Sequence, residues 1–361
     1  MTARICLVLA LTCTVPVLCF AQSSNSKDQC SPINWAADSD SQKAHKAHFK
    51  EVDAFIENAP NKDIQSVVVV KNGALVYESY PNGYTTRSLN DIRSAAKSIT
   101  ALLIGIAVDQ EKLRVDDTLL SFFEASSIED ADDERKQRIT IDHLLTMASG
   151  LNADADDNNT PGNENYLELA DDWLHFGLNI PMATEPGTRW AYASLNSFLL
   201  GAVLEKATGQ EFEEFADTYL LGPLGIESYR WTNTPKGLVV AQGNFFISGR
   251  DFAKIGQLIL NQGCWNGKQL ISQEWLQASF EDRYPVYWEN YDTYGYQWYN
   301  HTLTINDKPF SYRFASGNGG QKLYMVPDED LVVVTMTTAY NTNYGQRRSL
   351  EIFEGVLGAI D

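Results

Sequence analysis

The chain has 361 residues, of which 44% are hydrophobic and 21% are charged. It carries 47 acidic and 28 basic residues, a formal net charge of −19, which excludes nucleic acid as a partner because phosphate binding needs clustered Lys and Arg. The 8 Trp, 17 Tyr and 16 Phe exclude a disordered chain, and the length favours two domains or one domain with a large insertion.

The first predicted element is a secretory signal peptide over residues 1–21. Arg4 is followed by an apolar stretch and then by a polar run that begins at Gln22, which is the usual layout of such a peptide. The apolar stretch is too short for a stable membrane span, and the alternative is a buried N-terminal helix. We therefore expect cleavage near Ala21, a polar segment over 22–45, and a periplasmic or secreted mature protein without a membrane span.

Signal cleavage would leave two cysteines, Cys30 and Cys264, in an oxidising compartment where disulfides persist. One pair with no leftover thiol is what a single bridge gives. Two unrelated buried thiols are the alternative, because the sequence does not determine the distance between them.

Two strands joined by a tight turn are predicted between Gln65 and Tyr80. Apolar runs flank Asn72-Gly73, and Asn-Gly between such runs is a strong hairpin signal. From Ser94 to Gln110 apolar residues recur at helical spacing, which predicts an amphipathic helix.

The segment 116–240 is predicted to be mostly helical with long loops. Thr140 is a suitable cap for a short amphipathic helix, and a helix over 197–208 is expected to end at Gly209. Residues 152–165 are rich in Asp, Asn, Gly and Pro, which is typical of a loop.

The C-terminal part alternates predicted strands with turns. After a helix over 251–260 and a turn at 266–267, strands are expected at 294–299, 302–305, 310–314, 322–326 and 331–337, followed by a helix through 348–357. Strands near both ends with helices between them predict an α/β (α+β) protein. Its sheet domain would comprise 46–115 and 241–361, split by a helical insertion of 116–240.

Ser94-Ala-Ala-Lys97 lies at the start of the predicted helix, where both side chains share one face. The helix N-terminus has free N–H groups and favours developing negative charge. A serine hydroxyl is a poor nucleophile until a base takes its proton, and Lys97 can be that base if desolvation keeps it neutral. The spacing alone is a weak signal, since Ser24-Asn-Ser-Lys27 repeats it in a polar tail.

Two further elements follow in the sequence. Tyr192-Ala-Ser194 precedes a predicted helix, and Ser316-Gly-Asn-Gly-Gly-Gln321 leads into a predicted strand. Three glycines allow close approach of the backbone to a bound group. Taken singly, the tyrosine is equally explained by packing and the glycines by a tight turn.

In this order, Ser-x-x-Lys, Tyr-x-Ser and a Gly-rich strand, the sequence resembles the serine β-lactamases and penicillin-binding proteins. Stretches similar to the class C branch follow in the family's order from about residue 66 to 355. They include Arg93-Ser-Ala-Ala-Lys-Ser-Ile-Thr, Leu113-Arg-Val-Asp-Asp, Ile141-Asp-His-Leu-Leu-Thr-Met-Ala-Ser-Gly-Leu151, Gly222-Pro-Leu-Gly-Ile and Arg250-Asp-Phe-Ala-Lys-Ile-Gly-Gln. The resemblance implies a β-lactamase/transpeptidase-like fold, in which an antiparallel sheet is flanked by helices and interrupted by a mostly helical domain.

The resemblance also implies a two-step acyl transfer. Ser94 attacks an ester or amide carbonyl while Lys97 and Tyr192 take its proton, and the N–H groups of Ser94 and Asn318 hold the oxyanion. Tyr192 then protonates the leaving group, and water releases the acyl group. Whether Lys97 or Tyr192 is the base stays open, because such a pair titrates as a unit. The other predicted oxyanion or substrate-binding residues are Ser194, Gly317 and Gly319.

Two departures from the class C pattern change the expected substrate. Ala315-Ser316-Gly317 stands where Lys-Thr-Gly is usual, and Ser194 stands where Asn is usual. Without that Lys, the cation that would hold a penicillin carboxylate is lost. The Gly-Asn-Gly-Gly-Gln form instead resembles the esterase and aminohexanoate-dimer hydrolase branch. We therefore predict a carboxylesterase or an amidase/peptidase-like enzyme acting on a small ester, amide or peptide. The alternatives are a true β-lactamase or DD-peptidase and a non-catalytic penicillin-binding-like sensor.

No cofactor or metal is predicted. His45-Lys-Ala-His48 lacks the further ligands of a metal site. The run from Asp154 to Asn158 imitates the start of a calcium loop, but Gly and the bidentate Glu are missing from their positions. The chain also lacks Gly-x-Ser-x-Gly, which argues against an α/β-hydrolase triad.

Overall fold

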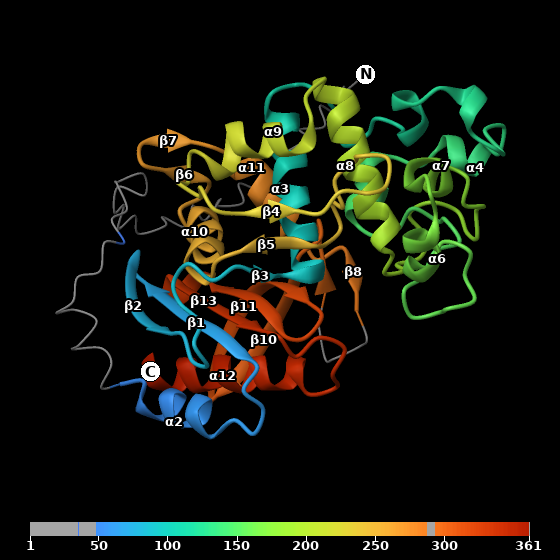
Figure 1. Ribbon diagram of the computed structural model, residues 1–361. Coiled ribbons are helices and arrows are strands. Elements are labelled where there is room, and N and C mark those ends of the chain that lie inside the picture. Colours follow the sequence, from blue (N-terminus) through green and yellow to red (C-terminus); the bar gives the residue numbers. More distant parts are fainter. Residues whose placement is uncertain (1–34, 36–47, 287–292, 361) are drawn as a thin grey trace, which may run out of the picture.

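The computed structural model in Figure 1 describes residue 35 and residues 48–286 and 293–360. The predicted signal peptide, Cys30, His45 and most of the segment 22–45 lie outside these residues. Within the described ranges, no helix combines the length and the apolar character that crossing a membrane requires.

The central layer is an eight-stranded antiparallel sheet in the order β2-β1-β13-β12-β11-β10-β9-β8. Its strands are β1 (Ile64–Lys71), β2 (Ala74–Ser79), β8 (Tyr284–Pro285), β9 (Thr293–Tyr294), β10 (Tyr299–Ile305), β11 (Lys308–Gly317), β12 (Gln321–Val326) and β13 (Leu331–Thr337). Because β1 pairs with β13, one sheet is built from strands near both ends of the sequence.

The predicted hairpin between β1 and β2 is confirmed. Asn72 has a φ of 53° and Gly73 a φ of 74°, the two left-handed conformations that a type I′ turn requires. Both faces of β1 are buried, which explains why its apolar residues form an unbroken run and do not alternate with polar ones.

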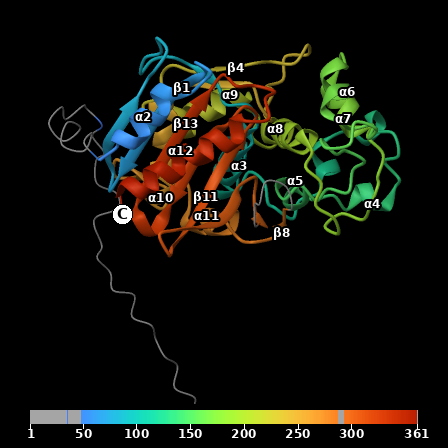
Figure 2. The ribbon, with the colours of Figure 1, turned by 90° about the horizontal axis from the view of Figure 1, so that it is seen from below.

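Helices cover both faces of the sheet (Figure 1). On the face of Val68 these are α3 (Ala96–Asp109) and α10 (Gly249–Leu260), and on the face of Val67 they are α2 (Lys50–Asn58) and α12 (Gly345–Ile360). Figure 2 shows α2 and α12 side by side. The sheet with helices on both faces confirms the predicted fold class.

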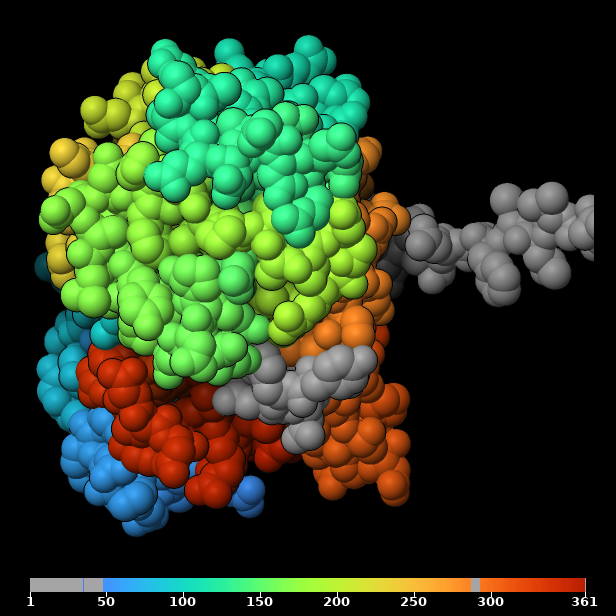
Figure 3. Space-filling model, turned by 90° about the vertical axis from the view of Figure 1, so that its right-hand side faces the viewer, coloured from blue at the N-terminus to red at the C-terminus, as the bar shows by residue number. Residues whose placement is uncertain are grey.

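The regular elements in the middle of the chain are nearly all helices, joined by long loops, and Figure 3 shows this part (green) above the C-terminal part (red) on one face. Its helices are α4 (Glu134–Gln137), α5 (Ile141–Leu145), α6 (Glu164–Leu169), α7 (Trp173–Leu178), α8 (Ser194–Thr208) and α9 (Phe212–Ala216). Helix α8 ends at Gly209 with a φ of 71°, as predicted, but it begins at Ser194, three residues before the predicted start. The division into a sheet domain and a helical insertion stays a prediction.

Two small sheets were not predicted. One pairs β3 (Asn90–Asp91), β5 (Phe245–Ile247) and β4 (Arg230–Trp231), and the other pairs β6 (Cys264–Trp265) with β7 (Lys268–Gln269) before helix α11 (Gln273–Ser279). Strands of two or three residues are too short to show a hydrophobic period, so sequence patterns do not reveal them.

The predicted strand over 294–299 is wrong. Strand β9 ends at Tyr294, and the chain then turns, with the Gly295 N–H donating to the Trp298 carbonyl at 3.0 Å and Gln297 at a φ of 61°. The aromatic residues of this segment are buried in the core, and tertiary packing overrides their preference for strands. Strand β10 starts only at Tyr299 and includes the predicted 302–305 strand.

Candidate active site

Ser94 lies in a single 3₁₀ turn, Arg93–Ala95, which continues directly into α3. The α-helix predicted to start at Ser94 therefore starts two residues later, at Ala96. Arg93 has a φ of 52°, a left-handed conformation that a helix does not contain and that few residues with a side chain adopt. The Arg93 N–H donates to Asp91 Oδ1 at 2.8 Å, which fixes the backbone immediately before Ser94.

The Arg93 side chain lies beside this turn. Its Nε is 3.2 Å from Asp91 Oδ2, and its guanidinium lies 4.5 Å above the centre of the Tyr340 ring. Burial raises the pKa of the Asp91 carboxyl, and the hydrogen bond and positive charge of Arg93 oppose that shift. The residue before the nucleophile candidate is thus anchored by an ion pair and an aromatic ring.

Lys97 is brought to Ser94 as the sequence predicts. Its Nζ donates to Ser94 Oγ at 3.0 Å and to the Gln242 carbonyl at 2.8 Å. Only 2% of Lys97 is exposed, so its amine is shielded from bulk water. No pattern in the sequence points to Gln242, because its contact with Lys97 joins residues 145 positions apart.

Tyr192 lies on the loop before α8, and its ring faces the same amine. Lys97 Nζ is 5.2 Å from the centre of the Tyr192 ring. The Ala155 N–H donates to the Tyr192 carbonyl at 2.8 Å, and the Ala191 N–H donates to the Met147 carbonyl at 2.9 Å. These backbone bonds attach the tyrosine loop to the neighbouring segments on both sides.

Ser194 is the first residue of α8 and is buried. Its Oγ has no hydrogen-bond partner among the described residues, so it does not accept a hydrogen bond from the Lys97 amine. The Gln242 carbonyl is the second acceptor of that amine. The expected substrate-binding role of Ser194 stays a prediction.

The end of β11 runs against the backbone that precedes Ser94. A Cβ on Gly317 would lie 2.1 Å from the Ile92 carbonyl oxygen, so only glycine permits this approach. Gly319 has a φ of 89° and packs against the backbone of Ala339 and Tyr340. The three-glycine motif thus serves close backbone contact at both of these positions.

Asn318 follows Gly317 and is held by its side chain, because the Asn341 N–H donates to Asn318 Oδ1 at 2.7 Å. Within the described ranges, neither the Ser94 N–H nor the Asn318 N–H has a hydrogen-bond acceptor. Two free backbone donors on adjoining segments are what an oxyanion hole needs.

Lys322 of β12 lies beside the end of β11, and no sequence pattern indicates this position. Ala315 faces the core with α3, and on the opposite face Ser316 pairs across the strands with Lys322. Lys322 Nζ donates to Ser316 Oγ at 2.8 Å and lies 4.9 Å from the centre of the Phe314 ring. Cross-strand register places it there, on the face away from Ala315, so it does not replace the missing Lys of Lys-Thr-Gly.

The described residues contain no group of three or more side chains that could hold a metal. In the loop that resembles a calcium site, Asn163 Nδ2 and Thr160 Oγ1 both donate to the Asp154 carbonyl, and Asp154 Oδ2 is 3.4 Å from Arg189. The loop is thus closed by its own side chains.

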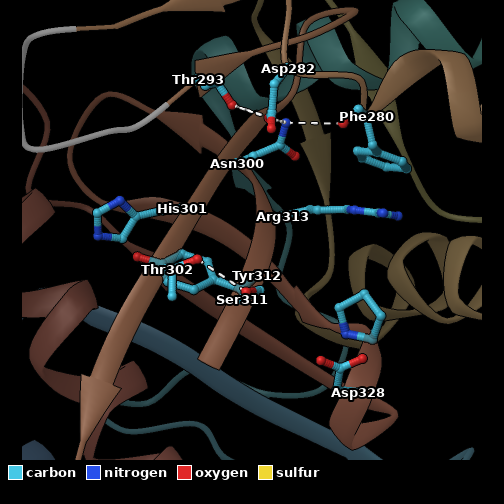
Figure 4. Close-up of a pocket in the computed structure, with 11 residues that line it drawn as sticks. Phe280, Asp282, Thr293, Asn300, His301, Thr302, Ser311, Tyr312, Arg313 and Asp328 are labelled. Atoms are coloured by element: carbon cyan, nitrogen blue, oxygen red, sulfur yellow. Dashed lines mark hydrogen bonds between the residues drawn. The ribbon is translucent and has the colours of Figure 1, made fainter. Parts of the chain in front are cut away.

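A separate cavity of about 320 Å³ lies on the outer side of β10 and β11 (Figure 4). In it Arg313 extends between Phe280 and Asp328, with its guanidinium 4.4 Å above the Phe280 ring. Burial lowers the pKa of Arg313, and the charges of Asp282 and Asp328 oppose that shift. Ser311, the serine that lines this cavity, is 3.1 Å from Thr302 Oγ1, and no lysine of the described residues donates to it, so it does not repeat the pair found at Ser94.

The chain is similar in sequence to several known proteins. A model of the beta-lactamase family matches residues 52–356. An uncharacterised protein of Alkalihalophilus pseudofirmus is 24% identical over 78% of this chain and 85% of its own. The 6-aminohexanoate-dimer hydrolase of Paenarthrobacter ureafaciens is 26% identical over 41% of this chain, and the match spans only 38% of that enzyme.

The fold recurs in a solved structure as well. The class C beta lactamase from Rhodobacter sphaeroides superposes with a TM-score of 0.64 at 18% identity. The superposition covers 88% of this chain and 100% of that one. At this level of identity the likeness extends to the fold alone.

Proposed function

Because this chain belongs to the beta-lactamase family, we propose that it is a serine hydrolase that works through a covalent acyl group on Ser94. The observation that carries the proposal is the contact between Lys97 Nζ and Ser94 Oγ, 3.0 Å apart, with the amine buried. A nucleophile and a base at hydrogen-bond distance are the minimum for this chemistry.

In the first step Ser94 Oγ attacks the carbonyl carbon, and its proton passes to the Lys97–Tyr192 pair. The charge on the substrate oxygen is received by the N–H groups of Ser94 and Asn318. The carbon–oxygen or carbon–nitrogen bond then breaks, and the leaving alcohol or amine takes the proton from the pair. By resemblance to the family, Tyr192 is the residue that donates this proton to the leaving group.

In the second step water attacks the acyl carbon and gives one proton to the same pair. Collapse of the intermediate returns that proton to Ser94 Oγ and releases a carboxylic acid. In each step the pair of amine and phenol therefore first takes up a proton and then releases it, and the two groups share that proton.

Small esters and amides are the proposed substrates. Ala315 offers no charge where the family usually places a lysine, so a β-lactam carboxylate loses its usual partner. Similarity to an aminohexanoate-dimer hydrolase supports amide bonds as a second class. A true β-lactamase or DD-peptidase is the competing assignment, which the family match itself favours.

Mass spectrometry tests the nucleophile. The mature protein is treated with a fluorophosphonate and its peptides are mapped. We expect a single adduct on Ser94, its loss in Ser94→Ala, and a fall in kcat of roughly 10⁴-fold or more. Ser98→Ala is the matched control, because Ser98 lies one turn further along α3 and its Oγ donates to the Gln297 carbonyl. An adduct on another serine in the wild-type protein would refute the assignment.

The same protein is then assayed on short acyl esters, short amides, nitrocefin and benzylpenicillin. The missing lysine leads us to expect the highest kcat/KM for the esters or amides. The reverse ranking would make the chain a β-lactamase.

We further propose that the protein is exported, because of the N-terminal pattern described above. We also propose that residues 46–115 and 241–361 form one domain and that 116–240 are inserted into it. In this arrangement Ser94 comes from the first unit and Tyr192 from the second, so the site would lie between them.

A further inference from the structure

The peptide between Gly317 and Asn318 carries the proposed second oxyanion donor. Its carbonyl oxygen accepts two hydrogen bonds. The Gly317 carbonyl oxygen accepts the Gly320 N–H at 3.2 Å and the Gln346 Nε2 amide at 2.8 Å. The carbonyl and the Asn318 N–H belong to the same planar unit. Whatever fixes the carbonyl therefore also fixes the direction of that N–H.

Gln346 comes from the first turn of α12, which is pressed against the glycine loop. A Cβ on Gly345 would lie 2.3 Å from the Gly319 carbonyl oxygen, so the backbones are in direct contact. One turn further along, Ser349 Oγ donates to the Gly320 carbonyl at 2.6 Å. The base of the Gln346 side chain is thus held in place by the helix that carries it.

The neighbouring peptides are held by other groups. Gln321 Nε2 donates to the Asn318 carbonyl at 3.3 Å, and the Asn341 N–H donates to the Asn318 side chain. Of the described side chains, Gln346 is the one that donates to the Gly317 carbonyl. It therefore acts on the peptide that carries the proposed second oxyanion donor.

A donor on an amide carbonyl also polarises the amide. The carbonyl oxygen gains negative charge and the N–H becomes a stronger donor, a cooperative gain of about 10–30% per bond. The stronger N–H stabilises the negatively charged oxygen of the transition state more than the neutral carbonyl oxygen of the bound substrate. It therefore lowers the activation barrier more than it tightens substrate binding.

We propose that Gln346 is a positioning residue of the oxyanion hole, which orients and polarises the Gly317–Asn318 peptide without touching the substrate. This inference rests on the proposed function, since it needs acyl transfer at Ser94. Because the proposed effect acts on the transition state, it predicts a change in kcat and not in KM.

The test compares Gln346→Met with Ser349→Ala. Met keeps the length of the side chain and removes the donor, whereas Ser349→Ala removes a bond from the same helix to a carbonyl outside the oxyanion peptide. For Gln346→Met we expect kcat on a short ester to fall about tenfold with KM within about twofold. A boronic acid that forms a tetrahedral adduct should lose affinity to a similar extent. Ser349→Ala should lower the melting temperature at least as much and leave kcat within about twofold.

A second variant, Gln346→Glu, keeps the shape and places a carboxylate where the donor was. It should lower kcat further than Met does. Equal kcat values for Gln346→Met and the wild type, or equal losses in Gln346→Met and Ser349→Ala, would overturn the proposal. Failure of the proposed function looks different, because the wild-type protein would then form no fluorophosphonate adduct on Ser94.

Discussion

At the scale of single residues, two backbone positions shape the site in addition to the contact between Lys97 and Ser94. The left-handed conformation of Arg93 turns the chain from β3 into the 3₁₀ turn that carries Ser94. Gly317 lets β11 approach the Ile92 carbonyl. Together they bring the segments of Ser94 and Asn318, which are more than 200 residues apart in the sequence, next to each other.

Gly317→Ala tests this arrangement. An added Cβ would meet the Ile92 oxygen at 2.1 Å, so the end of β11 must move away and carry the Asn318 N–H with it. Loss of one oxyanion donor costs about 10²–10³ in kcat, and we expect a fall of that size by steady-state kinetics on a short ester.

Gly358→Ala is the control, because a Cβ at that position of α12 meets nothing within 4 Å. It should keep full activity and add about 0.5–1 kcal/mol of stability. A Gly317→Ala protein with wild-type kcat and KM would show that Asn318 takes no part in the oxyanion hole.

At the scale of elements, the short helix α5 depends on its cap. Thr140 Oγ1 accepts the His143 N–H at 3.3 Å, and His143 Nδ1 accepts the Thr140 N–H at 3.1 Å. The second bond requires an unprotonated Nδ1. Burial lowers the pKa of His143, and the adjacent Asp142 opposes the shift. The helix packs on α8, the helix that follows the tyrosine loop.

The lowered pKa of His143 makes stability depend on pH. Between the folded and the unfolded pKa the unfolded chain binds more protons, so the contribution is fully present above about pH 6.5 and is lost as the pH falls below that value. In urea titrations at about pH 7.5 and about pH 5, the wild type should lose more stability than His143→Gln. Gln at this position is a usual capping-box partner and does not titrate. Equal losses in the two proteins would contradict this role of the imidazole.

At the scale of the whole molecule, the sheet joins the two ends of the described chain, because β1 pairs with β13. The buried ion pair between Asp63 and Arg348, together with the Tyr344 hydroxyl on Asp63, ties the start of β1 to α12. The ends of the described chain are thus held independently of any covalent link.

The predicted bridge between Cys30 and Cys264 would add such a link. Cys264 is buried at the start of β6, and Cys30 lies outside the described residues. The chain-entropy model gives roughly 4 to 5 kcal/mol for so long a loop. We expect reduction to lower the melting temperature more than the activity, because Cys264 belongs to a hairpin apart from Ser94, Lys97 and Tyr192.

Thiol titration of the denatured, unreduced mature protein decides the matter. We expect no free thiols. Two free thiols per chain would contradict the bridge and would support the alternative of two separate thiols.

The sequence by itself determined the features that are encoded locally. The Asn72-Gly73 turn, the helical period after Ser94, the cap at Thr140 and the end of α8 at Gly209 each depend on a few neighbouring residues, because turn chemistry and side-chain period act over that range. The spacing of Ser94 and Lys97 is local for the same reason, so their contact could be predicted.

Only the tertiary structure decided how distant segments meet. The Gln242 carbonyl on Lys97, Gly317 against Ile92, Lys322 beside Ser316 and Gln346 on the Gly317 carbonyl each join residues from separate elements. The short β3-β5-β4 sheet and the turn inside the predicted 294–299 strand belong to this group as well. Such contacts depend on strand register and on the packing of helices against the sheet, which are properties of the whole core and leave no period in the sequence.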